Sequence, residues 1–238
     1  MGPGEPAVSL HGIQKDYKGL RPLRIARLEL RLGESVALLG LDRAAAESLV
    51  NLITGATLPD AGRVDVFGTS TDAIRDPDTW LRTLDDFGIL SERAVLLDQF
   101  TVEQNLALPL SLELDEMSPA IRAQAQRLAG EVGIAAGDLT RAVAALGPLA
   151  QMRVRLGKAL ALGPRVVLAE HPNAMLAAGD LPGFASDFAA VAARRGVAAL
   201  VLTADRTFAR AVARRVLTLN AATGDVTPVA GWRRWLPS

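Results

Sequence analysis

The sequence predicts an α/β protein with a mixed sheet core, an antiparallel β-subdomain at its N-terminus and an inserted helical subdomain. The first observation is the alternation of apolar and polar residues near the N-terminus, which is typical of antiparallel strands with one face in a core. The second is a series of short apolar runs that alternate with helices after residue 164. Such a series favours a parallel sheet covered on both faces. The third is a long helical stretch between these regions.

The N-terminal region contains strands and one helix. We expect antiparallel strands at 8–17 and 23–33, with a glycine turn at Gly33, then a buried strand at 35–40, a helix at 43–54, and a turn and strand within 58–68. The helix has one apolar stripe, formed by Ala46, Leu49, Val50 and Ile53.

The middle of the chain, from residue 78 to about 162, is mostly helical, with a short strand at 87–90. Thr101 is a favourable N-cap residue, and Ser118 with Pro119 predicts the start of another helix. We therefore interpret residues 1–238 as a single domain. Its predicted parts are a sheet-rich core at 8–90 and 164–230, a helical subdomain at 91–163 and a tail at 231–238.

The C-terminal region alternates strands with helices. We expect strands at 165–170, 197–205 and 215–220, helices at 181–196 and 205–214, and a hairpin turn at 222–225. Asp180 is expected to cap the helix that follows it.

The composition excludes several classes of protein. Zero net charge and a pI near 6.8 give no electrostatic reason to expect nucleic-acid binding. The absence of cysteine excludes a disulfide framework and a thiolate metal site. No uncharged apolar run reaches the length of a membrane span, and the N-terminus lacks the pattern of a signal peptide. We therefore expect an intracellular protein.

One stretch, GLDRAAAESLVNLITG from Gly40 to Gly55, has the position of a phosphate-binding loop without its chemistry. It follows an apolar strand and enters a helix. The pattern G-x-x-x-x-G-K-[ST] requires Gly, Lys and Ser or Thr where this chain has Ala45, Ala46 and Glu47.

The order of such segments resembles the ATP-binding subunit of an ABC transporter over nearly the whole chain. GESVALLGLDRAAAESLVNLITG resembles the Walker A segment, TVEQNLALPL the helix after the Q-loop, RVRLGKALALGPRVVLAEHPN the signature helix with Walker B, and VLTADRTFARAVARRVLTL the switch strand and last helix. The resemblance implies a P-loop NTPase fold of ABC type.

The resemblance also assigns a nucleotide site. Tyr17 corresponds to the aromatic residue that stacks on adenine, and Gly40 opens the loop. Arg43 stands at an inner glycine position, where it would either reach a phosphate or block the backbone N–H groups. Glu47 replaces the magnesium-binding hydroxyl, and Ser48 takes the second hydroxyl position, where it would cap or pack.

The catalytic positions of the family are altered. Ala46 replaces the phosphate-binding lysine, Glu92 the Q-loop glutamine, and Ala204 the switch histidine. Glu170 and His171 replace the Walker B aspartate and the hydrolytic glutamate. Glu170 retains a carboxylate that would hold a metal weakly. His171 is either a metal ligand or general base, or a histidine at a strand end in a polar cleft.

Two further motifs are altered. The D-loop aspartate corresponds to Ala177, and the LSGGQ signature is replaced by LGPLA at 146–150, in which Pro148 lacks a backbone donor and Leu149 adds bulk.

Together these changes predict a pseudo-ATPase, in which ATP and Mg²⁺ binding are both doubtful. The resemblance implies that the groove from Glu92 to about Leu112 docks a membrane permease, that the chain forms a homodimer or a heterodimer with an ABC ATPase subunit, and that it lies in the cytoplasm on the inner face of the membrane. Trp232 and Trp235 in the tail would contact the domain, a partner or the membrane.

Two alternatives stay open. One is an ATP-hydrolysing transporter subunit with unusual site residues, and the other is a soluble scaffold or regulatory protein that uses the same fold. The sequence does not identify a transported substrate or a direction of transport.

Overall fold

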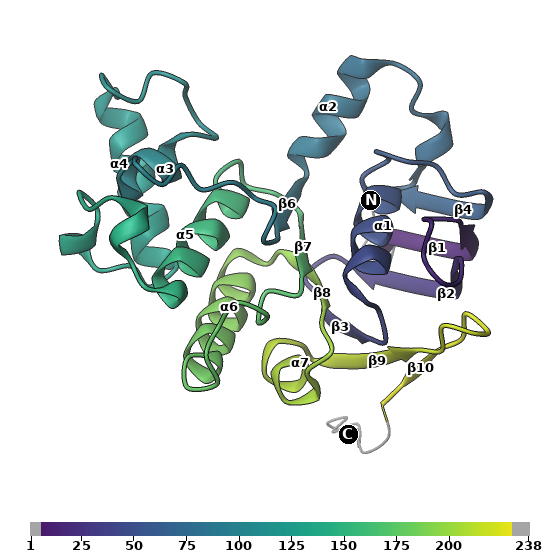
Figure 1. The fold of residues 1–238 in the computed structure, drawn as a ribbon. Helices are drawn as coiled ribbons and strands as arrows, with labels where there is room; N and C mark the ends of the chain where they lie inside the picture. Colours follow the sequence, from purple (N-terminus) through teal and green to yellow (C-terminus); the bar gives the residue numbers. More distant parts are fainter. Residues whose placement is uncertain (1–5, 230–238) are drawn as a thin grey trace, which may run out of the picture.

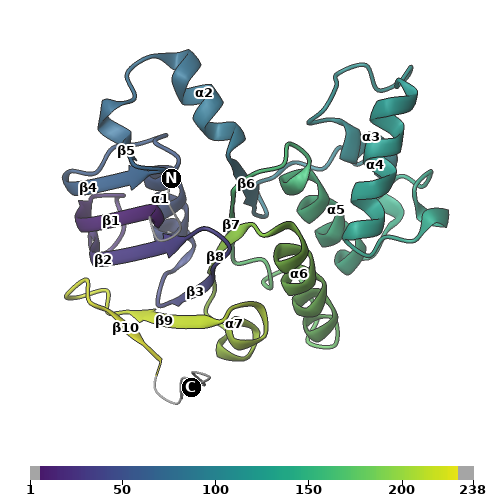
Figure 2. The same cartoon turned by 180° about the vertical axis from the view of Figure 1, so that it is seen from behind.

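A computed structural model describes residues 6–229, and a mixed six-stranded sheet runs through its centre (Figures 1 and 2). The five strands other than β10 are parallel, as the alternation of apolar runs and helices predicts. β10 pairs antiparallel with β9 and makes the sheet mixed. The order across the sheet is β10 (Val226–Pro228), β9 (Arg215–Leu219), β3 (Ser35–Leu39), β8 (Ala198–Leu202), β7 (Val166–Glu170) and β6 (Phe87–Leu90).

A second, antiparallel sheet is formed by the N-terminal region. Its order is β2 (Leu23–Arg31), β1 (Pro6–Lys15), β4 (Ala61–Val66) and β5 (Thr69–Ser70). Its inward residues, such as Leu10 and Ile25, are fully buried, which accounts for the alternating pattern of the sequence.

The two faces of the central sheet are covered differently. On one face Val36 and Leu38 share a core with helix α1 (Arg43–Ile53) and the antiparallel sheet. On the other face Ala37 and Val201 share a core with α6 (Leu181–Arg195), with α7 (Arg206–Val212) and with the helices of residues 102–160. The sheet is therefore buried on both sides.

The helical subdomain lies at one end of the molecule, away from the antiparallel sheet (Figure 1). It contains α3 (Val102–Ala107), α4 (Pro119–Glu131) and α5 (Pro148–Leu160), with short 3₁₀ turns at Ala136–Asp138 and Val143–Ala145. Thr101 caps α3 in a capping box with Gln104. Helix α2 (Pro77–Asp85) lies outside this group and precedes β6.

Most expected elements are present, with small changes in their bounds. The first strand begins and ends two residues earlier than expected, and β8 is shorter than the expected 197–205. β5 was not expected, whereas β10 pairs antiparallel with β9 across the hairpin turn expected at 222–225. Asp180 stands at the N-cap of α6, but its side chain makes no capping hydrogen bond, so the expected cap is wrong. The predicted tail contacts of Trp232 and Trp235 lie outside the described residues.

Within residues 6–229, no helix is long and apolar enough to cross a membrane.

Gly40, at the end of β3, has no room for a side chain. Its φ is 98°, and an added Cβ would lie 2.5 Å from the carbonyl oxygen of Leu219. We expect Gly40→Ala to lower the free energy of unfolding by about 3 kcal/mol, through backbone strain and overpacking. Gly68→Ala is the control, since Gly68 also has a positive φ but faces open space. That change should cost only about 1 kcal/mol. Urea denaturation measures both, and equal losses would contradict the steric argument.

Candidate functional site

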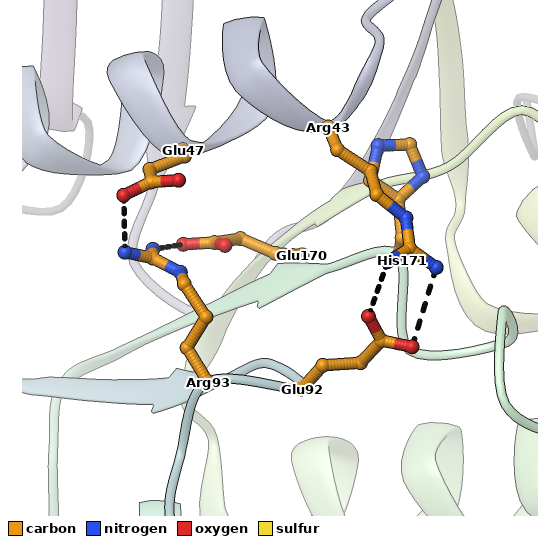
Figure 3. A pocket seen from close by; sticks show the side chains of 6 residues that line it. All are labelled: Arg43, Glu47, Glu92, Arg93, Glu170 and His171. Carbon is orange, nitrogen blue, oxygen red and sulfur yellow. Dashed lines mark hydrogen bonds and ion pairs between the residues drawn. The ribbon is translucent and has the colours of Figure 1, made fainter.

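The carboxyl ends of the parallel strands β3, β6 and β7 lie at one edge of the central sheet, where α/β folds usually carry their sites. A cavity of about 220 Å³ opens there. Its lining residues come from α1, from the segment after β6 and from the end of β7 (Figure 3). They are Arg43, Glu47, Glu92, Arg93, Glu170 and His171.

The N-terminus of α1 is already occupied by a carboxylate. Asp42 is the N-cap residue, and its side chain accepts a hydrogen bond of 2.8 Å from the backbone N–H of Ala45. A phosphate bound to this helix would compete for the same N–H groups against a negative charge. Ala45 and Ala46 are buried in the core, so neither projects a polar group toward the cavity.

Arg93 bridges two carboxylates from different elements. Its Nη1 lies 2.6 Å from Oε1 of Glu47 on α1, and its Nη2 lies 2.6 Å from Oε1 of Glu170 at the end of β7 (Figure 3). The Glu170 side chain is only 8% exposed, whereas the Glu47 and Arg93 side chains are nearly half exposed. The guanidinium therefore provides the counter-charge that a buried carboxylate requires.

Arg43 pairs with Glu92 rather than remaining free for a phosphate. Its Nη1 lies 2.6 Å from Oε2 of Glu92, and its Nη2 lies 3.3 Å from Oε1, so the contact is bidentate. The sequence left two roles open for Arg43, reaching a phosphate or blocking the loop. In the structure Arg43 has a third role, since its side chain reaches across the cavity and pairs with Glu92 in the segment after β6 (Figure 3).

His171 lines the same cavity, and its backbone conformation is strained. Its φ is 43°, which is uncommon for a residue other than glycine. Its N–H donates to the carbonyl oxygen of Leu202 at 2.8 Å, and its buried Nε2 has no hydrogen-bond partner among the described residues. Within residues 6–229 there is no group of three or more His, Cys, Asp or Glu residues arranged to hold a metal ion. His171 directly follows the last residue of β7, and the choice between its two expected roles stays a prediction.

Tyr17 and Gly40 line a different hollow, of about 60 Å³, together with Asp42. Burial of the Tyr17 hydroxyl, with a smaller effect of the Asp42 charge, raises the pKa of Tyr17. Four of the five expected nucleotide residues are thus divided between two cavities, Arg43 and Glu47 in one and Tyr17 and Gly40 in the other.

Ser48, Ala204 and the residues of LGPLA do not line either cavity. Ser48 is buried within α1, and Ala204 is exposed after β8. In LGPLA, Gly147 is the N-cap of α5, Pro148 is its first residue, and Leu149 packs against the core.

The sequence analysis missed two residues of the site, Asp42 and Arg93. Asp42 had a readable signal, since an Asp before a helical stripe is a typical N-cap residue. Arg93 had none, because only the fold brings it to Glu47 and Glu170, 46 and 77 residues away in the chain.

The charges of the main cavity nearly balance internally. Three carboxylates and two guanidiniums leave one negative charge, before Asp42 is considered. Both arginines are paired with carboxylates that line the same cavity.

Comparison with known proteins places the chain in a family. The profile of the ABC transporter family matches residues 23–174. The lipoprotein-releasing system ATP-binding protein LolD of Anaeromyxobacter dehalogenans is 33% identical over 84% of this chain and 85% of its own length. The sulfate/thiosulfate import ATP-binding protein CysA 2 of Chromobacterium violaceum is 30% identical over 90% of this chain, which spans only 56% of that protein.

Solved structures agree on the fold. The dimeric structure of the ABC transporter cassette MJ0796 superposes with a TM-score of 0.77, covering 94% of this chain and 100% of that one at 22% identity. A post-hydrolysis structure of MJ0796 bound to ADP and Pi gives a TM-score of 0.74. The chain therefore belongs to the ABC transporter family, as one of its ATP-binding subunits.

Proposed function

We propose that this chain is an ABC-type subunit that does not hydrolyse ATP, binds nucleotide weakly or not at all, and acts by docking to a permease and to a partner ATPase subunit or a second copy of itself. The observation that carries the proposal is the Arg93 bridge. Its guanidinium lies between Glu47 and Glu170, the two positions that the family uses to hold magnesium.

The residues at the reacting positions support the same conclusion. Ala46 supplies no charge to a phosphate, and His171 supplies no carboxylate to orient an attacking water. Loss of one group that stabilises a transferring phosphate typically costs roughly 10³ to 10⁵ in rate. Several losses in one site leave no group to perform the hydrolytic step.

A working ATP-binding subunit is the second candidate. The names of LolD and CysA 2 describe ATP-binding proteins, and MJ0796 has been solved with ADP and Pi. In this candidate Arg93 would swing away and nucleotide would enter between Glu47 and Glu170. The negative charge of the cavity opposes this, because triphosphate would meet three carboxylates.

In this proposal, docking to the permease depends on exposed apolar side chains and not on the residues of the cavity. Val95 and Leu112, which lie before and after α3, are 68% and 87% exposed. A contiguous apolar patch on a surface marks a contact with another protein or a membrane, and the proposal takes these two side chains as part of such a patch. We place the permease contact there, with the chain in the cytoplasm at the inner face of the membrane.

The purified chain should release no phosphate from MgATP above background, because the lysine, hydroxyl and hydrolytic carboxylate are replaced. A phosphate-release assay checks this, with Glu170→Gln as the comparison. Activity equal in both proteins is contamination. Activity present in the wild type and lost in Glu170→Gln would overturn the proposal.

Removing a carboxylate from the cavity should favour nucleotide. We expect calorimetry to give no binding heat for the wild type at millimolar ATP, with or without Mg²⁺. Glu47→Gln should give a measurable binding heat at the same ATP concentration, because one repulsive charge is removed and Arg93 is partly released. Glu113→Gln, an exposed carboxylate outside the cavity, is the control and should behave as the wild type. Tight, Mg²⁺-dependent binding by the wild type would favour the second candidate.

A charge on the docking surface should release the chain from the membrane. Leu112→Asp should reduce its recovery in the membrane fraction of its native cells several-fold, because a desolvated carboxylate opposes the contact. Leu20→Asp alters an equally exposed leucine in the β1–β2 loop and should change nothing. Equal recovery of both variants would argue against docking through Leu112.

A further inference from the structure

The segment from Ser91 to Thr101 carries the chain out of the central sheet and into the helical subdomain. It begins where β6 ends and finishes at the N-cap of α3. We call residues 91–101 the connector. Its two halves are attached to different parts of the molecule.

The first half of the connector is attached to the sheet side by ion pairs. The Glu92 carboxylate accepts hydrogen bonds from Arg43 of α1. The Arg93 guanidinium donates to Glu47 of α1 and to Glu170 of β7. Figure 3 shows both connector residues pointing into the cavity, opposite α1. These contacts join the connector to the two elements that the family uses for phosphate and metal.

The second half is attached to the helical side through its backbone. Nζ of Lys158 on α5 donates to the carbonyl oxygen of Val95 at 2.6 Å, and Nε of Arg155 donates to that of Ala94 at 3.3 Å. Burial lowers the pKa of both α5 side chains. The N–H of Leu97 donates to Oδ1 of the buried Asn105 at 2.9 Å, and the Asn105 amide returns a bond to the Leu97 carbonyl.

The boundary between the two attachments therefore lies between Arg93 and Ala94. A guanidinium is well suited to the sheet side, because its planar fork reaches two carboxylates at once and it stays charged at all physiological pH values. A bound cation would bring the same two carboxylates together but would leave when its concentration fell. Arg93 is part of the chain and is always present.

We propose that Arg93 is a built-in ligand of the cavity, which fixes the connector, and with it the attachment of the helical subdomain, to the sheet without nucleotide or metal. This inference rests on the proposed function, since a site filled by ATP would need Arg93 displaced. The central sheet and the helical subdomain would thus keep the same relative arrangement whether or not ATP is present. Because most of the paired groups are partly exposed, the attachment weakens as salt rises.

Amide hydrogen exchange tests this in the nucleotide-free chain. In Arg93→Gln, the amides of Arg93 and Ala94, which bond to Ser91, should exchange at least about tenfold faster. The Leu97 amide, held by Asn105, should be unchanged. This difference separates local release from global unfolding. Arg63→Gln removes a similar arginine–carboxylate pair, with Asp65 on β4, and should leave all three amides as in the wild type.

A charge exchange provides the rescue. Arg43→Glu and Glu92→Arg should each speed exchange at Arg93 and Ala94, and the double variant should return it toward the wild-type rate. If Arg93→Gln does not fold, the wild type at rising NaCl replaces it. Exchange at Arg93 and Ala94, but not at Leu97, should then accelerate between about 0.05 M and about 1 M.

Unchanged exchange in Arg93→Gln, or in the salt series where that variant does not fold, would overturn the inference. Acceleration of all three amides together would do the same, because it would show general unfolding. The proposed function fails separately, if the wild type hydrolyses MgATP or if MgATP changes exchange at the connector. Neither result alters what the nucleotide-free comparison says about Arg93.

Discussion

The ion pair between Arg93 and Glu170 is the interaction on which the site depends. Glu170 ends a strand in the middle of the fold and is almost fully buried, so its charge needs a partner. In a nucleotide-binding member of the family that partner would be a hydrated metal. Here it is a side chain from the connector, which also takes up Glu47. Both carboxylates are thereby paired with a side chain of the same protein.

The substitutions around the cavity are consistent with this internal partner. Glu47 would repel a triphosphate, but beside Arg93 it completes a bridge between α1 and the connector. Arg43 and Glu92, at positions that elsewhere hold a glycine and a glutamine, pair with each other. Asp42 caps α1 where a phosphate would bind. Residues that would repel a triphosphate are thus paired with arginines of the same cavity.

The scaffold around the cavity is closely packed on both sides of the central sheet. Both faces of the central sheet are covered by continuous apolar cores, and the helical subdomain rests on one of them. Gly88 of β6 contacts the backbone of Ala159 on α5 so closely that no Cβ would fit. The proposed docking role needs a stable fold and apolar side chains at its surface, and it needs no turnover of ATP.

The sequence by itself determined the fold, and it predicts that the site has lost its phosphate chemistry. Apolar periodicity gave nearly every strand and helix, because burial of one face imposes a period that can be read without coordinates. Position in the loop showed that Ala46 and Glu47 lack the phosphate chemistry. Only the tertiary structure showed which side chains pair with Glu47 and Glu170. Arg93 meets Glu47 and Glu170 because parallel strands end at one sheet edge, and this proximity leaves no local pattern in the chain.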